Sequence, residues 1–196
     1  MKSRRWVSCL LSLAGCWLIG AGVSAGQGDS VTRPFAPGGA VRLDLSAGAY
    51  VIQPGRDDQI VVRWKTTTPE EMASVKVDVR VRGTDADIVT NGPRNHFDVT
   101  IEVPARSNLD ARLSAGDLRI YVIEGNKRVE SWAGRIDIDV GRPEDYASVQ
   151  AKVTAGELVA GPFDQKKGGL FRSFDWKGPG RYTLDVRLTA GDIRLR

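Results

Sequence analysis

The stretch from residue 171 to residue 182, "FRSFDWKGPGRY", has the side chains of a binding surface. Aromatic rings that alternate with cations can stack on sugar rings or bases, but they can equally cap a hydrophobic core. The candidate binding patch comprises Phe171, Arg172, Phe174, Trp176 and Tyr182. We expect Phe171 and Phe174 to belong to a cap, whereas Trp176 fits either interpretation.

Residues for catalysis or metal binding are sparse. His96 is the only histidine, and the turn-rich "NGPRN" before it indicates a solvated loop. Asp117, Glu157 and Asp192 occupy one position of a recurring phrase, but a calcium site needs six or more converging oxygens and Arg135 would oppose a cation there. We therefore predict no catalytic, cofactor-binding or metal-binding residues, and no enzyme.

The first 25 residues have the layout of a secretory signal peptide. A cationic start, "MKSRR", precedes an apolar run over residues 6–23, and small residues precede a predicted cleavage between Ala25 and Gly26. The apolar run could instead stay as an uncleaved anchor. In a third interpretation, "LAGC" is a lipobox and Cys16 is lipidated. We expect export to the periplasm or outer cell envelope, with a lipoprotein anchored at Cys16 as the alternative.

Loss of this segment would change both thiol content and charge. Cys9 and Cys16 are the only cysteines, so the cleaved chain would have neither a disulfide nor a cysteine metal site. Removing Lys2, Arg4 and Arg5 would lower the formal net charge from +4 to +1. A nearly neutral protein is a poor partner for nucleic acid, which we exclude.

Beyond residue 40 the sequence alternates between apolar and polar residues. Runs such as "VRLDL" at 41, "VKVDVRV" at 75 and "YTLDVRL" at 182 predict half-buried strands, and the helical patch "PEEMAS" at 69 amounts to one turn. We predict a linker over residues 26–40 and one nearly all-β domain over residues 41–196.

An Ala-Gly phrase occurs five times in this domain. The apolar residues before and after each phrase are separated by an odd number of positions, yet the pattern requires both to face the core. Residues five apart in a flat strand point to opposite faces, so the chain must turn at each phrase. Glycine in second place suits a type II corner better than a two-residue hairpin. The predicted turns are Ala47, Gly48, Ala115, Gly116, Ala133, Gly134, Ala155, Gly156, Ala190 and Gly191.

Successive phrases lie 18 and 22 residues apart, from Ala115 to Ala133 and on to Ala155, which is typical of one coil of a solenoid. Stacking in register would place opposite charges side by side. The expected pairs are Asp117 with Arg135, Arg119 with Asp137, and Arg135 with Glu157. The pattern predicts a parallel β-solenoid with short coils, from which residues 166–182 leave as a loop. An antiparallel β-sandwich is the alternative.

Over residues 41–196 the "[ST]AG[DE][LI]" phrases behind a bacterial-type signal resemble the putative-adhesin domain family of bacterial envelope proteins. Trp132 departs from the pattern by standing where serine or threonine is usual, and residues 53–109 lack the phrase. The resemblance implies a right-handed parallel β-solenoid and a non-catalytic binding or scaffold role, with an envelope protein or glycan as partner. An envelope carbohydrate-active enzyme and a sensor domain that binds an envelope protein remain alternatives.

Overall fold

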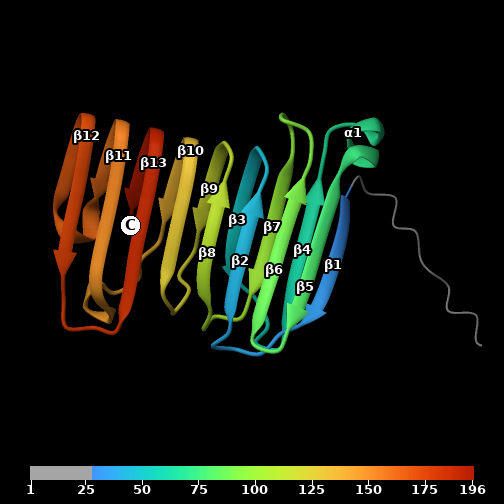
Figure 1. Cartoon of the computed structure of the whole chain (residues 1–196), viewed down its shortest axis with the longest axis horizontal. Coiled ribbons are helices and arrows are strands. Elements are labelled where there is room, and N and C mark those ends of the chain that lie inside the picture. Colours follow the sequence, from blue (N-terminus) through green and yellow to red (C-terminus); the bar gives the residue numbers. More distant parts are fainter. Residues whose placement is uncertain (1–27) are drawn as a thin grey trace, which may run out of the picture.

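The structure is a computed structural model that describes residues 28–196, apart from the side chains of residues 165–167 (Figure 1). The predicted signal peptide, the cleavage site at Ala25 and Gly26, and Cys16 lie outside the described residues. The strands are β1 (Gly28–Pro34), β2 (Ala40–Leu45), β3 (Gly48–Pro54), β4 (Gln59–Lys65), β5 (Lys76–Arg82), β6 (Asp85–Asn91), β7 (Asp98–Val103), β8 (Asn108–Leu113), β9 (Gly116–Ile120), β10 (Lys127–Ile138), β11 (Tyr146–Ala160), β12 (Gln165–Lys177) and β13 (Tyr182–Leu195). The helix α1 (Pro69–Ser74) and two 3₁₀ turns, Pro143–Asp145 and Gly161–Phe163, complete the fold.

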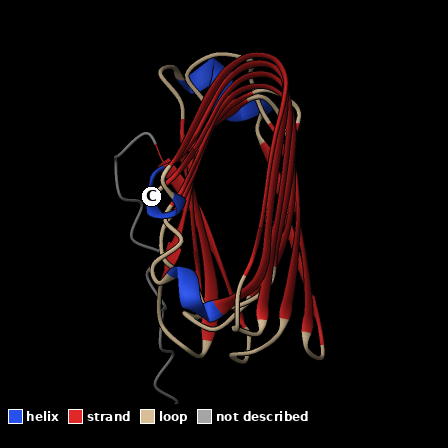
Figure 2. Ribbon diagram, turned by 90° about the vertical axis from the view of Figure 1, so that its left-hand side faces the viewer, coloured by secondary structure: helices blue, strands red, loops and turns tan. Residues whose placement is uncertain are grey.

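All the strands belong to one mixed sheet. Ten of them follow the order β1-β4-β7-β3-β9-β10-β8-β2-β6-β5, with parallel pairs in the middle and antiparallel pairs at both ends. The two ends of this path, β1 and β5, come back into contact, so the sheet is nearly closed into a barrel. Figure 2 shows the result as two walls of strands joined along one bent edge.

The predicted right-handed parallel β-solenoid is wrong, because a chain that only winds in one direction would pair its strands in parallel throughout. Here β1 with β4, β4 with β7, and β5 with β6 are antiparallel and curl the sheet into its barrel-like form. The antiparallel β-sandwich is not found either, since the middle pairs are parallel. The spacing of the Ala-Gly phrases could not indicate these antiparallel strands, because most of them lie in residues 53–109, where the phrase is absent.

Two further segments differ from their predictions. The stretch expected to leave the sheet as a loop contains β12, which pairs with β11 in an antiparallel ladder. Residues 28–34, inside the predicted linker, form β1. The one-turn helix is found as α1, where the Thr68 side chain caps the Glu71 backbone N–H and the Glu71 side chain accepts from the Thr68 backbone.

The bent edge is formed by strands that continue from one wall into the other. Residues 127–131 of β10 pair with β8, and residues 134–138 pair with β9 on the opposite wall. Strands β11 and β13 are similarly long, with 15 and 14 residues. The last strand in sequence, β13, lies between β10 and β11.

Period-two alternation places the apolar side chains between the two walls. In β2 the buried residues are Val41, Leu43 and Leu45, with charged residues between them on the outside. The same pattern in the other strands produces one continuous hydrophobic core. Within the described residues, no helix is long and apolar enough to span a bilayer.

Candidate functional site

The five Ala-Gly phrases meet at the bent edge. Gly116, Gly134 and Gly191 stand side by side in register, and Gly48 and Gly156 extend the row at either end. A Cβ atom on Gly116 would collide with the carbonyl oxygen of Gly48, and one on Gly134 with that of Gly116. These glycines allow neighbouring backbones to approach closely, which is a structural role.

Four of the stacked glycines have positive φ, namely Gly116 (116°), Gly134 (120°), Gly156 (140°) and Gly191 (126°). Gly48 does not, but its missing side chain leaves room for Phe97. The alanines follow the same row: Ala190 is in register with both Ala133 and Ala155. The Ala115 carbonyl accepts a hydrogen bond from the Gly48 N–H at 3.1 Å, whereas Ala47 lies between β2 and β3.

The residues just before these alanines form a second row on the outside of the bend. The pairs on either side of Trp132 in the β10–β13 register place it beside Thr189. The β11–β13 register places Thr189 beside Thr154 of β11. Trp132 is 70% exposed. The position that is serine or threonine in the other phrases therefore presents an indole ring to solvent in β10.

A groove of about 550 Å³ runs along this row. Trp132, Thr189 and Thr154 line it, and so do charged residues two positions earlier in the same strands. We name it the bend groove, and define it by Trp132, Thr154, Thr189, Arg112, Glu130, Lys152 and Arg187.

Cations outnumber acids in the bend groove. Arg187 contacts Asp185 at 2.9 Å and Glu130 at 3.8 Å. Arg112 and Lys152 form no ion pair with any residue between 28 and 196 whose side chain is described. Two charges of the groove are thus available to a ligand.

The candidate patch predicted from sequence is divided between the core and the surface. Phe174 is 5% exposed and packs against Phe163 at a ring-centroid distance of 5.3 Å. Trp176 is half-buried and lies 5.0 Å from the same ring, so both residues close the end of the core. Phe171, by contrast, is 79% exposed, and Arg172 is exposed beside it.

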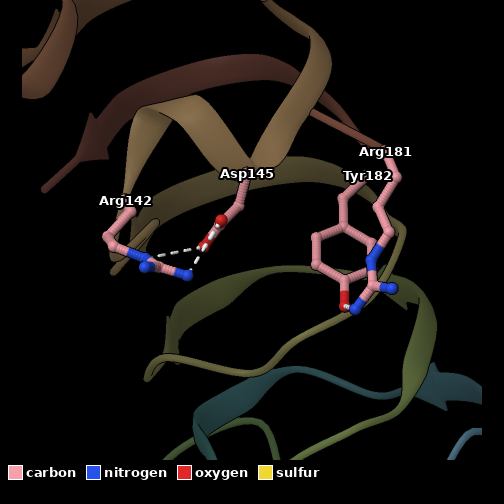
Figure 3. Close-up of polar contacts among 4 residues, drawn as sticks. All are labelled: Arg142, Asp145, Arg181 and Tyr182. Atoms are coloured by element: carbon pink, nitrogen blue, oxygen red, sulfur yellow. Dashed lines mark hydrogen bonds and ion pairs between the residues drawn. The ribbon is translucent and has the colours of Figure 1, made fainter. Parts of the chain in front are cut away.

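The fifth residue of that patch, Tyr182, borders a different crevice of about 390 Å³. Arg181 lies over the Tyr182 ring at 4.8 Å and donates a hydrogen bond to its hydroxyl at 2.6 Å (Figure 3). Arg142 donates two hydrogen bonds to the Asp145 carboxylate, at 3.0 and 3.1 Å. Both arginines are thus already engaged within the crevice, which leaves it less available for a charged ligand than the bend groove.

One buried cation could not be recognised from the sequence. Lys127 is 2% exposed at the start of β10, and its Nζ donates to the Tyr146 hydroxyl at 2.9 Å and to the Gly125 carbonyl at 3.2 Å. Burial lowers the pKa of Lys127 to about 8, although Glu124 opposes the change. Burial also raises the pKa of Tyr146. Both side chains of the pair are buried.

Charges alternate across the outer faces of both walls. Asp117 is in register with Arg135, and Arg119 with Asp137, as predicted. The expected pairing of Arg135 with Glu157 is wrong, because β13 intervenes and places Asp192 beside Arg135. Asp192 accepts a hydrogen bond from the Glu157 backbone N–H at 3.2 Å.

Residues for catalysis remain scattered. His96 lies exposed in the loop between β6 and β7 with a φ of 55°. Among the residues that the structure describes, no three histidine, cysteine, aspartate or glutamate side chains are grouped to hold a metal ion.

Comparison with solved structures gives a match over most of the chain. The structure of a putative cell adhesion protein from Clostridium sporogenes aligns with a TM-score of 0.55 and 13% identity, covering 86% of this chain and 98% of that one. The fold is similar to that of this putative cell adhesion protein. This agrees with the resemblance to the putative-adhesin family that the Ala-Gly phrases indicated.

Other matches are weaker. A putative adhesin from Parabacteroides distasonis has a TM-score of 0.29 and 10% identity, covering 87% of this chain and 71% of its own. One from Bacteroides fragilis has a TM-score of 0.26 and 9% identity, with coverages of 86% and 97%. No protein-family model matches the sequence, and no curated protein does.

Proposed function

We propose that the protein is exported and acts as a non-catalytic, adhesin-like binding module of the cell envelope, with the bend groove as its contact surface. The observation that carries this proposal is Trp132, an indole ring 70% exposed beside a groove lined by more cations than acids. The similarity to a cell adhesion protein and the predicted signal peptide support the adhesive role and the export.

The exposure of Trp132 has no explanation in folding. A tryptophan stabilises a protein by burying its large apolar surface, and Trp132 leaves most of that surface in water. Tryptophan is enriched at interfaces, where its ring supplies a large apolar face and its N–H a hydrogen-bond donor. The neighbouring Thr189 and Thr154 show that the bend itself can be built with smaller side chains at this position.

Binding to isolated cell-envelope particles tests the proposal. Trp132→Thr restores the residue type of the other phrases, and we expect it to lower the affinity for the particles at least tenfold without changing the melting temperature. Tyr121→Ala is the matched control, since Tyr121 is also an exposed aromatic residue but does not line the groove. Sedimentation of labelled protein with the particles measures both.

Equal binding by Trp132→Thr and the unchanged protein would contradict the bend groove as the contact surface. Cleavage of an envelope glycan, abolished by a single carboxylate substitution, would contradict the non-catalytic role and favour a carbohydrate-active enzyme. Loss of binding in Tyr121→Ala to the same extent would show that the effect is not local to the groove.

A further inference from the structure

We propose that the bend groove binds an anionic polysaccharide, with Trp132 and Phe171 stacking on its sugar rings and Arg112, Lys152 and Arg187 contacting its carboxylates. This inference rests on the proposed function and adds the chemical class of the ligand. It follows from the spacing of the two aromatic residues, the groups between them and the charge of the groove.

Trp132 and Phe171 lie on the same row across four neighbouring strands. The registered pairs of Val153 with Arg172 and Ala155 with Leu170 place Phe171 opposite Thr154. The order of strands is then β10, β13, β11 and β12, as Figure 1 shows at one end of the molecule. Three strand spacings separate Trp132 from Phe171, or about 14 Å.

This span suits an extended chain of rings better than a single small molecule. The two positions between the aromatic residues are Thr189 and Thr154, whose hydroxyls can donate to and accept from sugar hydroxyls. Aromatic faces at both ends with hydroxyls between them match a linear polysaccharide, in which apolar ring faces and hydroxyl groups alternate.

The backbone of Phe171 supports a role in binding. Its φ is 53°, in the left-handed region that costs a bulky residue free energy, and its side chain is 79% exposed, so burial offsets little of that cost. Strained residues of this kind cluster where a ligand is held. Phe174, three residues later on the same strand, instead packs in the core.

Charge complementarity decides between a neutral and an anionic ligand. Arg112, Glu130, Arg187 and Lys152 follow one another across β8, β10, β13 and β11, so the groove contains three cations and one acid. Glu130 and Asp185 neutralise Arg187 in part, whereas Arg112 and Lys152 form no ion pair with a side chain that the structure describes. Two separated cations fit carboxylates spaced along a sugar chain.

The same charges disfavour a nucleic acid. A polynucleotide carries one phosphate on every unit and is held by many basic groups. Here acidic residues adjoin the cations, since Asp44 is in register with Arg112 and Glu130 lies between Arg112 and Arg187. A polysaccharide depends less on charge, because Trp132, Thr154 and Thr189 offer its sugar rings and hydroxyls contacts of their own.

Polygalacturonate and its methyl ester provide matched probes, because they share a backbone and differ in charge. We expect the full-length protein to bind polygalacturonate at least tenfold more tightly than the ester. Lys152→Gln and Arg112→Gln should each weaken binding to polygalacturonate at least threefold, and Phe171→Ala should weaken binding to both probes. Lys76→Gln is the control, since Lys76 is an exposed lysine on β5, outside the groove.

Several outcomes would overturn the inference. Equal affinity for polygalacturonate and its ester would show that charge is not recognised, and equal or tighter binding of poly(dT) would show that the groove is not selective for a polysaccharide. If envelope particles bind in a Trp132-dependent manner but polygalacturonate does not bind, the ligand class is wrong and the proposed function stands. If neither binds, the proposed function fails as well.

Discussion

Neighbouring strands are held together differently at the bent edge and at the opposite end, where loops connect the strands. At the bent edge the backbones of Gly116, Gly134 and Gly191 stack directly, with no room for a side chain. At the opposite end, side chains add connections to those of the backbone: the Asn126 backbone N–H donates to Asn108 Oδ1 at 3.0 Å, and the Thr183 N–H donates to Asn126 Oδ1 at 2.9 Å.

The difference shows which contacts produce a recognisable sequence pattern. Close backbone contact tolerates only glycine, so the bent edge repeats one phrase. Hydrogen bonds that involve side chains can be made by several residue types, and here asparagine, threonine and lysine side chains all take part. The bent edge should therefore be intolerant of substitution, whereas the opposite end should lose stability in smaller steps.

The largest effect is expected for Gly116→Val. The new side chain would combine a positive φ with a collision against the Gly48 carbonyl, and we expect it to lower the free energy of unfolding by at least about 3 kcal/mol. Gly38→Val is the control, because Gly38 also has a positive φ, 87°, but no atom lies near its Cβ position. Urea denaturation measures both, and equal losses would show that backbone stacking contributes nothing.

A smaller effect should appear at the opposite end as a dependence on pH. The pKa of Lys127 falls from its ordinary value of 10.5 to about 8 in the folded protein, so the unfolded chain binds more protons between these values. Stability therefore rises with pH, by about 2 kcal/mol between pH 8 and pH 10. Above pH 10 the raised pKa of Tyr146 reverses the trend, because tyrosine ionises more readily in the unfolded chain.

Lys127→Met provides the control for this pH dependence. Its free energy of unfolding should stay level between pH 8 and pH 10, since the titrating group is gone. Chemical denaturation at several pH values measures the difference. The same rise in the variant as in the unchanged protein would assign the effect to another group.

Asn126→Ala should cost about 1 kcal/mol. It removes the acceptor for the Thr183 N–H and hydroxyl, which water can partly replace because the contact is exposed. Asn126→Asp keeps an acceptor oxygen and should recover part of the loss. Thermal denaturation compares the three proteins, and an unchanged Asn126→Ala variant would mean that this end does not depend on side-chain hydrogen bonds.

The smallest effect is expected on the outer face. Asp117→Arg would place two arginines side by side, and we expect a loss below about 1 kcal/mol that declines with added salt. Combining it with Arg135→Asp should restore only part of the loss, because the new aspartate would face Asp192 on its other side. Purely additive losses in a double-mutant cycle would contradict the register.

The all-β class, the bend at each Ala-Gly phrase and the alternation of the core could be predicted from the sequence, because period-two patterning and glycine chemistry act locally. The mixed sheet could not, since the direction in which two distant strands pair depends on where the chain returns. The position of β13 between β10 and β11 is an example: sequence order alone favoured Glu157, not Asp192, as the neighbour of Arg135.

The candidate site was predicted only in part. Aromatic composition singled out residues 171–182, but the sequence did not separate Phe171 on the surface from Phe174 in the core. Trp132 was visible as a departure from the phrase, and that departure was the available signal for the groove. Its proximity to Lys152 and Arg187 could not be predicted, because it depends on the same placement of β13.

The position of β13 also sets an order of assembly. Strands β11 and β12 pair with each other, but β11 joins the rest of the sheet only through β13, which follows both in the chain. Within the described residues, 146–177 can therefore pair with the rest of the sheet only after residues 182–195 have been synthesised. Trp132 of the bend groove and Phe171 beside it come into line only when β13 is in place, so this surface depends on the last strand in the sequence.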